Sequence, residues 1–294
     1  MSGRVDPAAA EALPASRGPG FFRRLCRSRG AALSLLCIAT MVLLAVFAPL
    51  VAGFDPLEGG ADALLPPLSP GHWLGTDDLG RDIWAQVVHG ARVSLTVGIV
   101  TAIAAVTIGT LVGALAGYYG GWPDIVLMRV SEFFQTLPRF VLALIVIALF
   151  GAGLLKVIAV IALLSWPQTA RLVRASVASL RQQPFVDAAR VGGMGDRALM
   201  LREILPNVAA PIIVTGSLDV AGAILLEAGL GFFGLGDPNY VSWGGMLNDA
   251  QQYLRVAWWM SLFPGLAIAV TVLSFNVLGD ALNDALNPRN RSAA

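Results

Sequence analysis

Six long apolar runs constrain the fold of this chain more than any motif does. They cover residues 31–52, 93–116, 125–150, 154–171, 208–230 and 258–278. Each is close to the roughly 20 residues that a helix needs to cross the hydrocarbon core of a bilayer. Backbone groups in lipid must find partners within the protein, so runs of this length predict helices. The predicted fold class is therefore an all-α integral membrane protein with six transmembrane helices.

The composition favours the same class. The chain has 294 residues, of which 56% are hydrophobic and 13% charged, whereas about a quarter of the residues in soluble domains are charged. The surplus apolar surface predicts contact with membrane lipid. A net charge of +1 gives no basic field for nucleic acid, so no nucleic-acid partner is expected. Cys26 and Cys37 lack CxxC spacing, so neither a disulfide framework nor a metal site is predicted.

Arginines predict the orientation. Residues 1–30 form a tail that is predicted to be disordered and that ends in a basic collar. The apolar run behind this collar is too long for a signal peptide and is followed by a poor cleavage site, which favours an uncleaved span. Further arginines lie around residues 172–207 and in the tail 287–294. Because cytoplasmic loops carry an excess of Lys and Arg, this loop and both termini are predicted to be cytoplasmic, flanking one transmembrane domain over 31–286.

The polar loop has the pattern of two short helices. Pro184 suits a first helical position, and Asp187 meets the positive end of the helix dipole. Gly192 and Gly193 can take the left-handed geometry that ends a helix. Asp196 is predicted to cap a second helix over residues 197–203. A flat helix of small residues between two membrane spans has a shape that another protein can grip.

Two other polar intervals are predicted on the opposite side of the membrane. In residues 54–92, Thr76 is predicted to cap a short amphipathic helix that carries Leu79, Ile83 and Val87 and lies on the membrane surface. Residues 231–257 form the second interval. His72 and His89 lack a metal-ligand spacing, so they are expected to be solvated or interface side chains.

The polar loop resembles the EAA loop of ABC-importer membrane subunits. The similarity is carried by Asp187-Ala188-Ala189, Gly193 and the pair Leu205-Pro206, although Asp187 replaces the usual Glu and Glu203 replaces a preferred Ile. Two further stretches resemble the dipeptide/oligopeptide/nickel permease family, specifically its C-type subunit. They are LGTDDLGRDIW at 74–84, and LEAGLGFFGLG at 226–236 followed by SWGGML at 242–247. The similarity covers about residues 22–289.

This resemblance implies a type I importer permease in a bacterial cell (inner) membrane. The expected partners are a homologous second permease subunit, two ATP-binding subunits and an extracytoplasmic solute-binding protein. The chain would form half of a translocation path for di- or oligopeptides, with nickel chelates or glutathione as alternative substrates. The residues implied to contact an ATPase are Phe185, Val186, Asp187, Ala188, Ala189, Gly193, Leu205 and Pro206. ATP and Mg²⁺ would be used by the partner ATPases, and this chain would bind no cofactor and would not be an enzyme.

Independent features of the sequence narrow the function. The single lysine, Lys156, is followed by Val157, so the chain lacks the GK[ST] of a P-loop and would draw its energy from a partner. A secondary transporter would need its own coupling-ion site, and a passive membrane scaffold stays open as a further alternative. A membrane protease is disfavoured because both histidines lie in a polar interval.

Ionisable residues within the predicted spans can line a translocation path or have a structural role. Asp219, near the middle of its run, is a candidate for the translocation path, and an interhelical hydrogen bond is equally open. Arg129 and Glu132 are spaced for a structural ion pair. Glu227 lies near a span end, which predicts a cap or turn role. Glycines spaced along residues 98–117 predict close helix packing; they are Gly98, Gly109, Gly113 and Gly117.

Overall fold

The computed structural model describes residues 28–286, and the regular structure in this range is helical. The helices are α2 (Arg29–Val46), α3 (Ala48–Val51), α4 (Ile83–Tyr119), α5 (Gly121–Thr136), α6 (Arg139–Phe150), α7 (Leu154–Leu180), α8 (Pro184–Val191), α9 (Asp196–Ala198), a π-helical turn (Leu199–Ile204), α10 (Leu205–Phe232), α11 (Trp243–Ala250), a 3-10 turn (Gln251–Tyr253) and α12 (Trp259–Leu286).

The membrane-spanning helices confirm the predicted fold class. Five are long and apolar enough to cross a bilayer: α2, α4, α7, the continuous run Asp196–Phe232 that includes α10, and α12. The bent pair α5 and α6 passes the same test only when the two helices are taken together, which gives five or six spans. The chain is therefore a multi-pass membrane protein. The tails 1–27 and 287–294, with most of the basic collar, Cys26, Arg289 and Arg291, lie outside the described residues.

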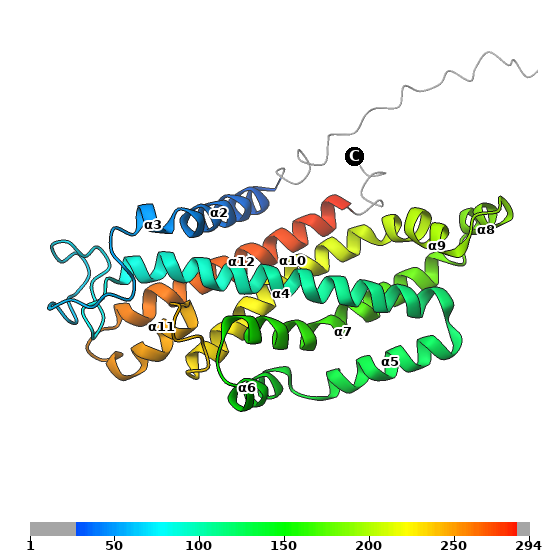
Figure 1. Ribbon diagram of the computed structural model, residues 1–294. Coiled ribbons are helices and arrows are strands. Elements are labelled where there is room, and N and C mark those ends of the chain that lie inside the picture. The colour runs from blue at the N-terminus through cyan, green and yellow to red at the C-terminus, as the bar shows by residue number, and fades with distance from the viewer. Residues whose placement is uncertain (1–27, 287–294) are drawn as a thin grey trace, which may run out of the picture.

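The helices form an elongated bundle with two different ends (Figure 1). One end carries α8 and α9 and is called the α8 end. The opposite end carries the loop 53–82 and α11 and is called the loop end. Helix α2 begins near the middle of the bundle's length, and α12 ends nearer to α8 than to the loop end. Helix α4 runs through the middle and packs against α7, α10 and α2.

Helices α4 and α7 approach each other closely because α4 has no side chains at three contact points. A Cβ atom added at Gly109, Gly113 or Gly117 would lie 2.7, 2.4 or 2.6 Å from a backbone carbonyl oxygen of α7. At Gly98 it would lie 2.7 Å from Ile224 of α10. The predicted close packing at all four glycines is confirmed, and small residues are what let transmembrane helices meet backbone to backbone.

The predicted single helix over 125–150 is wrong. The structure bends by 84° between α5 and α6. Pro138 has no backbone N–H and disfavours helical geometry in the residue before it. Leu137 accordingly has extended backbone angles, φ −89° and ψ 138°. Arg139 is the first residue of α6, directly after this break.

The predicted surface helix capped by Thr76 is also wrong. Helix α4 starts at Ile83, where Asp82 caps it by accepting a bond from the Ala85 N–H at 2.8 Å. It then continues for 37 residues through the predicted span. At 1.5 Å per residue it is about 55 Å long, well beyond the ~30 Å of a hydrocarbon core. Thr76 instead ties the preceding loop together, because its hydroxyl accepts from Leu65 N–H at 2.9 Å and donates to the Asp62 carbonyl at 2.6 Å.

Candidate functional site

Helix α8 forms at the first of the two helix patterns in the polar loop, the one that begins at Pro184. Pro184 lies in the first turn, as does Asp187. The helix ends in a Schellman motif, in which the Met194 N–H donates to the Ala189 carbonyl at 3.1 Å and the Gly193 N–H to the Arg190 carbonyl at 3.0 Å. Gly193 has φ +85°. Gly192 has φ −68°, so only the second glycine of the pair needs left-handed geometry.

The inner face of α8 is fixed to the bundle through Val186. This side chain is 0% exposed and belongs to a buried cluster, here called the α8 seat. Its other buried members come from α4, α7, the π-helical turn and α10: Ala114, Tyr118, Val173, Val177, Leu199, Ile204 and Val208. Full burial of a side chain of this size stabilises a structure by about 1.5–3 kcal/mol. Displacing α8 therefore has to displace the ends of three spans with it.

The outer face of α8 is free and mostly apolar. Phe185 is 40% exposed and Val191 is 89% exposed. Ala188 lies between them and is also exposed. Asp187 and Arg190 approach each other at 3.7 Å along the helix surface, a solvated pair that contributes little to stability. Exposed apolar side chains gathered on a short helix are typical of a protein contact surface.

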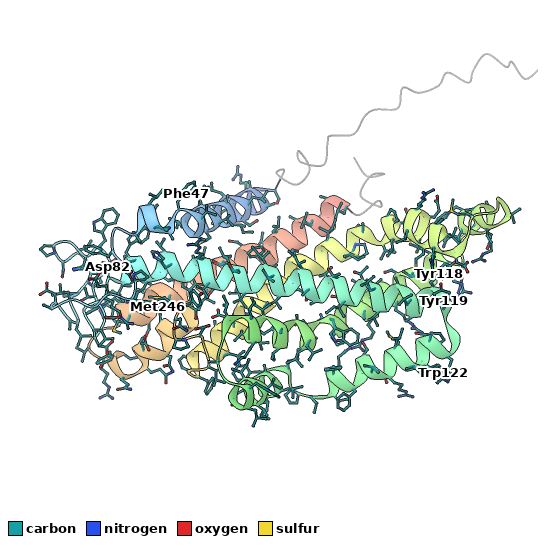
Figure 2. The ribbon with its side chains drawn as sticks, viewed as in Figure 1. Phe47, Asp82, Tyr118, Tyr119, Trp122 and Met246 are labelled. Carbon is teal, nitrogen blue, oxygen red and sulfur yellow. The ribbon has the colours of Figure 1, made fainter. Side chains whose placement is uncertain are left out.

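Asp196 provides a second connection between this segment and the bundle. The predicted capping role is wrong, because no side chain caps α9. The carboxylate instead accepts a bond from the Tyr118 hydroxyl at 2.5 Å. The Arg181 guanidinium lies 5.8 Å from the centre of the Tyr118 ring. Figure 2 shows Tyr118 at the end of α4 near α8, so this contact joins α9 to α4 and to the end of α7.

Leu205 and Pro206 lie where the π-helical turn passes into α10. The Leu205 N–H donates to the Met200 carbonyl, five residues earlier. Pro206 follows in the first turn of α10. Single π turns inside longer helices are frequent at functional sites. The second predicted helix is therefore joined to α10, and the two residues form the junction between the α8 segment and a span.

Asp219 lies in the middle of α10 and meets α7. Its carboxylate accepts a hydrogen bond from the Thr169 hydroxyl at 3.2 Å. The interhelical bond that the sequence left open is thus confirmed, and a role in the translocation path stays a prediction. Nearby on α7, Gln168 accepts a bond from the Arg139 guanidinium at 3.0 Å.

Glu227 has a different role from the one predicted. It lies inside α10 rather than at a cap or turn, is 5% exposed, and accepts a bond from the Ser94 hydroxyl of α4 at 2.9 Å. The indole N–H of Trp243 donates to the Val87 carbonyl at 2.9 Å. Added Cβ atoms at Gly231 or Gly244 would collide with backbone of the other stretch. The stretches 226–236 and 242–247 therefore pack together against α4 and close the bundle at the loop end.

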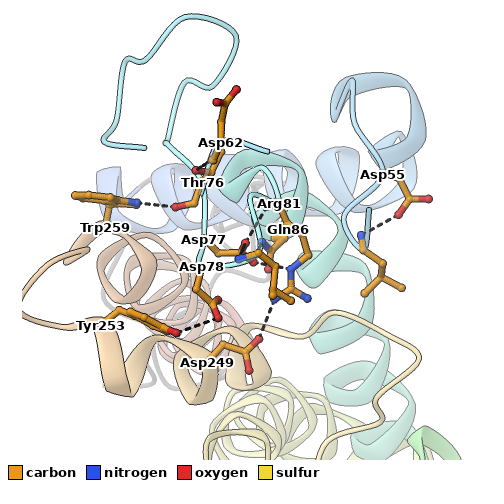
Figure 3. A network of polar contacts seen from close by, with 12 residues as sticks. Asp55, Asp62, Thr76, Asp77, Asp78, Arg81, Gln86, Asp249, Tyr253 and Trp259 are labelled. Atoms are coloured by element: carbon orange, nitrogen blue, oxygen red, sulfur yellow. Dashed lines mark hydrogen bonds and ion pairs between the residues drawn. The ribbon is translucent and has the colours of Figure 1, made fainter. Parts of the chain in front are cut away.

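A polar network at the loop end holds residues 74–82 against α11 and α12 (Figure 3). The Asp77 carboxylate accepts bonds from Arg81 Nε at 2.6 Å and from Gln86 Nε2 at 2.8 Å. Arg81 also approaches Asp249 at 3.4 Å, and burial raises the pKa of Asp249 above its ordinary value. Both histidines have polar contacts within the protein: His72 Nδ1 lies 2.8 Å from Asp82, the cap of α4, and His89 Nδ1 lies 3.0 Å from the Ala85 carbonyl oxygen.

A polar cavity lies between α5 and α7. It has a volume of about 280 Å³ and is lined mainly by charged and polar side chains. The predicted ion pair of Arg129 and Glu132 is confirmed at 3.1 Å on its rim. Arg174 of α7 binds both carboxylate oxygens of Asp124 at the side nearer to α8. Within residues 28–286, no three His, Cys, Asp or Glu side chains gather as a metal site would require.

Known proteins are similar in sequence to this chain over nearly its whole length. Residues 109–292 match a family model described as binding-protein-dependent transport system inner membrane component. Residues 17–67 match the N-terminal transmembrane domain of oligopeptide transport permease C. A dipeptide transport system permease protein of Alkalihalophilus pseudofirmus is 41% identical over 92% of this chain and 90% of its own. A di/tripeptide transport system permease protein of Pseudomonas aeruginosa is 39% identical, covering 93% of both chains. A glutathione transport system permease protein of Pectobacterium atrosepticum is 38% identical over 92% of this chain and 91% of its own.

Proposed function

Because this chain belongs to the family of binding-protein-dependent transport system inner membrane components, we propose that it is the permease subunit of an ATP-driven ABC importer for di- and oligopeptides. It is a transport subunit and not an enzyme. The relatives named for dipeptides and di/tripeptides support a peptide substrate. The relative named for glutathione supports glutathione, itself a small peptide, as the alternative substrate.

The proposed complex contains a homologous second permease, two ATP-binding subunits and an extracytoplasmic solute-binding protein, in a bacterial inner membrane. The lack of a P-loop in the sequence supports a separate ATPase, which would use ATP and Mg²⁺. The arginines around α8 support a cytoplasmic position for the α8 end. The loop end, with its network around Asp77, would then face the binding protein.

The division of α8 into a buried and a free face carries this proposal. The free face, with Phe185, Ala188 and Val191, would lie in a groove of an ATPase subunit. Closure of the ATPase pair upon ATP binding would displace α8. Because Val186 is buried in the α8 seat, and Tyr118 binds Asp196, the displacement would reach α4, α7 and α10 together. Their tilting would expose the path alternately to the two sides of the membrane.

A substitution on the free face tests the coupling role. Ala188 is exposed, so Ala188→Glu should leave the fold of this chain intact and place a charge in the ATPase contact. Gly193→Asp adds a carboxylate just beyond the helix, where an added Cβ meets no atom within 4 Å; because φ is +85° there, this variant also strains the end of α8. We expect both variants to reduce association with the ATPase and ATP-dependent peptide uptake in proteoliposomes by about tenfold or more, the loss typical of a disrupted interface anchor.

Asn283→Glu, an exposed position on α12, is the matched control and should behave like the unchanged protein. Normal uptake and ATPase association in both Ala188→Glu and Gly193→Asp would refute the coupling role. Uptake that persists without any ATPase subunit would instead favour a secondary transporter. Failure of the unchanged protein to take up any peptide in a complete complex would favour a scaffold.

A further inference from the structure

The face between α5 and α7 carries more charge than a lipid-facing surface can hold. Asp124, Ser131 and Gln135 follow each other along one side of α5, and Arg171 and Arg174 oppose them on α7. One turn further along α7, Gln168 binds Arg139, and its neighbour Thr169 binds Asp219. Ionisable groups cost about 2.5–3.5 kcal/mol each at the centre of a bilayer and therefore face protein or water. This stripe runs from the middle of α7, at Gln168, to the contact between Arg174 and Asp124 near the α8 end.

Two atoms within the stripe lack the partners that buried polar atoms normally have. Ser131 is 1% exposed, and neither its hydroxyl nor the Gln135 amide nitrogen has a hydrogen-bond partner among the described residues. Both side chains line the cavity between α5 and α7. Buried polar groups are almost always bonded to protein or water. A cavity of about 280 Å³ has room for several waters at about 30 Å³ each, so water or a polar solute can satisfy both atoms.

At the mid-membrane end of the stripe, two opposite charges have unused bonding capacity. The described side-chain hydrogen bond of Arg139 goes to neutral Gln168, and that of Asp219 comes from neutral Thr169. A guanidinium has five N–H donors and a carboxylate accepts about four bonds. Arg139 is near enough for its charge to act on Asp219, yet within residues 28–286 the two form no ion pair. They are two separate, opposite charges beside adjacent residues of α7.

We propose that the groove between α5 and α7 is the inward half of the peptide path, and that Asp219 and Arg139 bind the free ammonium and free carboxylate of a passing peptide. The inference rests on the proposed function and adds the place and the chemistry of recognition. A peptide with free termini presents an ammonium and a carboxylate, which these two side chains complement. The partners beyond them, Gln168, Gln135 and Ser131, can replace water on the peptide backbone.

Neutral substitutions test the charge recognition. Asp219→Asn and Arg139→Gln should each lower uptake of an unblocked dipeptide by about tenfold or more, because hydrogen bonds to charged groups contribute about 1.5–3 kcal/mol. Uptake is measured in proteoliposomes that hold the whole complex, at saturating peptide-loaded binding protein. ATPase activity and assembly should remain. Asp280→Asn, an exposed carboxylate on α12, is the control and should transport normally.

Water access is tested without transport. In full-length protein with Cys26 and Cys37 changed to Ser, Gln135→Cys, at a partly exposed position that lines the cavity, should react with a charged, membrane-impermeant thiol reagent applied from the α8 side. Leu36→Cys, which is exposed on the peripheral helix α2, should not react. The inference is overturned if Gln135→Cys is as unreactive as Leu36→Cys, or if Asp219→Asn and Arg139→Gln both transport normally. In the second case the unchanged complex still shows ATP-driven uptake, so the proposed function survives. Absence of uptake in the unchanged complex would instead refute the proposed function.

Discussion

Asp237 is a single side chain that holds the loop after α10 to the start of α7. One carboxylate oxygen accepts a bond from the Asn239 N–H at 3.0 Å, and the other accepts one from the Leu154 N–H at 3.0 Å. Leu154 is the first residue of α7, where the helix dipole favours a negative charge. These bonds, first the one from Asn239, lower the pKa of Asp237 below its ordinary value. The charged form therefore stabilises the folded protein.

We predict that Asp237→Asn lowers the melting temperature of the purified protein at pH 7. A lowered pKa stabilises the fold at every pH above the ordinary aspartate value of about 3.9, and the stabilisation is lost as the pH falls through the lowered pKa. The difference between the two proteins should thus be constant from pH 7 to about pH 5 and shrink below about pH 4. Asp284→Asn, an exposed carboxylate on α12, serves as control. A difference that grows on acidification would contradict the assignment.

Single residues also show where sequence reasoning succeeds and where it fails. Gly193 was predictable because left-handed geometry at a helix end is a local property. The roles of Thr76, Asp196 and Glu227 were predicted wrongly because each side chain bonds to a residue distant in sequence. Asp196, for example, has the local pattern of a cap, but its carboxylate binds Tyr118, which is 78 positions away. Local patterns cannot reveal which distant group competes for a carboxylate.

The helix pair α4 and α7 depends on the absence of side chains at its contact line. We predict that Gly113→Ala destabilises the protein by about 1–3 kcal/mol, since the added methyl group would overpack the contact with Ala170. Gly222→Ala on α10 is the matched control, because an added Cβ there meets nothing within 4 Å. In a helix this change should be neutral or stabilising, by about 0.5–1 kcal/mol. Melting temperatures in detergent measure both.

If Gly113→Ala melts like the unchanged protein, the close approach of α4 and α7 is wrong.

The existence of the spans could be predicted from the sequence because it follows from apolar length, which is a local quantity. The bend between α5 and α6 had a local signal in Pro138, but apolar residues continue on both sides and hid it. The full length of α4 was missed because polar residues at its start resemble a loop, whereas Asp82 caps a helix that continues into the membrane.

The free face of α8 and the path groove both require the other subunits, so neither could be derived from this chain's periodicity alone. The sequence identified the α8 segment through its polar character and its resemblance to known permeases. It did not indicate the cavity between α5 and α7, because residues such as Ser131 and Arg171 line one cavity only when these two helices pack. Long-range packing brings together what sequence spacing separates.

The uninterrupted helix α4 joins the loop network near Asp82 to the contact of Tyr118 with Asp196 at the α8 end (Figures 1 and 2). Coupling free energies between two binding sites are reciprocal and are typically worth a 5- to 150-fold change in affinity. We predict that the peptide-loaded binding protein tightens binding of a non-hydrolysable ATP analogue to the assembled complex. The analogue should tighten binding of the loaded binding protein by the same factor.

Titration calorimetry on the reconstituted complex measures both factors, and Tyr118→Phe should reduce them equally while leaving each affinity alone unchanged. A factor of one in both directions would show that α4 does not couple the two binding sites. If the loop end binds the solute-binding protein and the α8 end binds the ATPase, as proposed, a stiff helix α4 would let binding at one end change binding at the other before any nucleotide is hydrolysed. The importer would then hydrolyse little ATP in the absence of peptide-loaded binding protein.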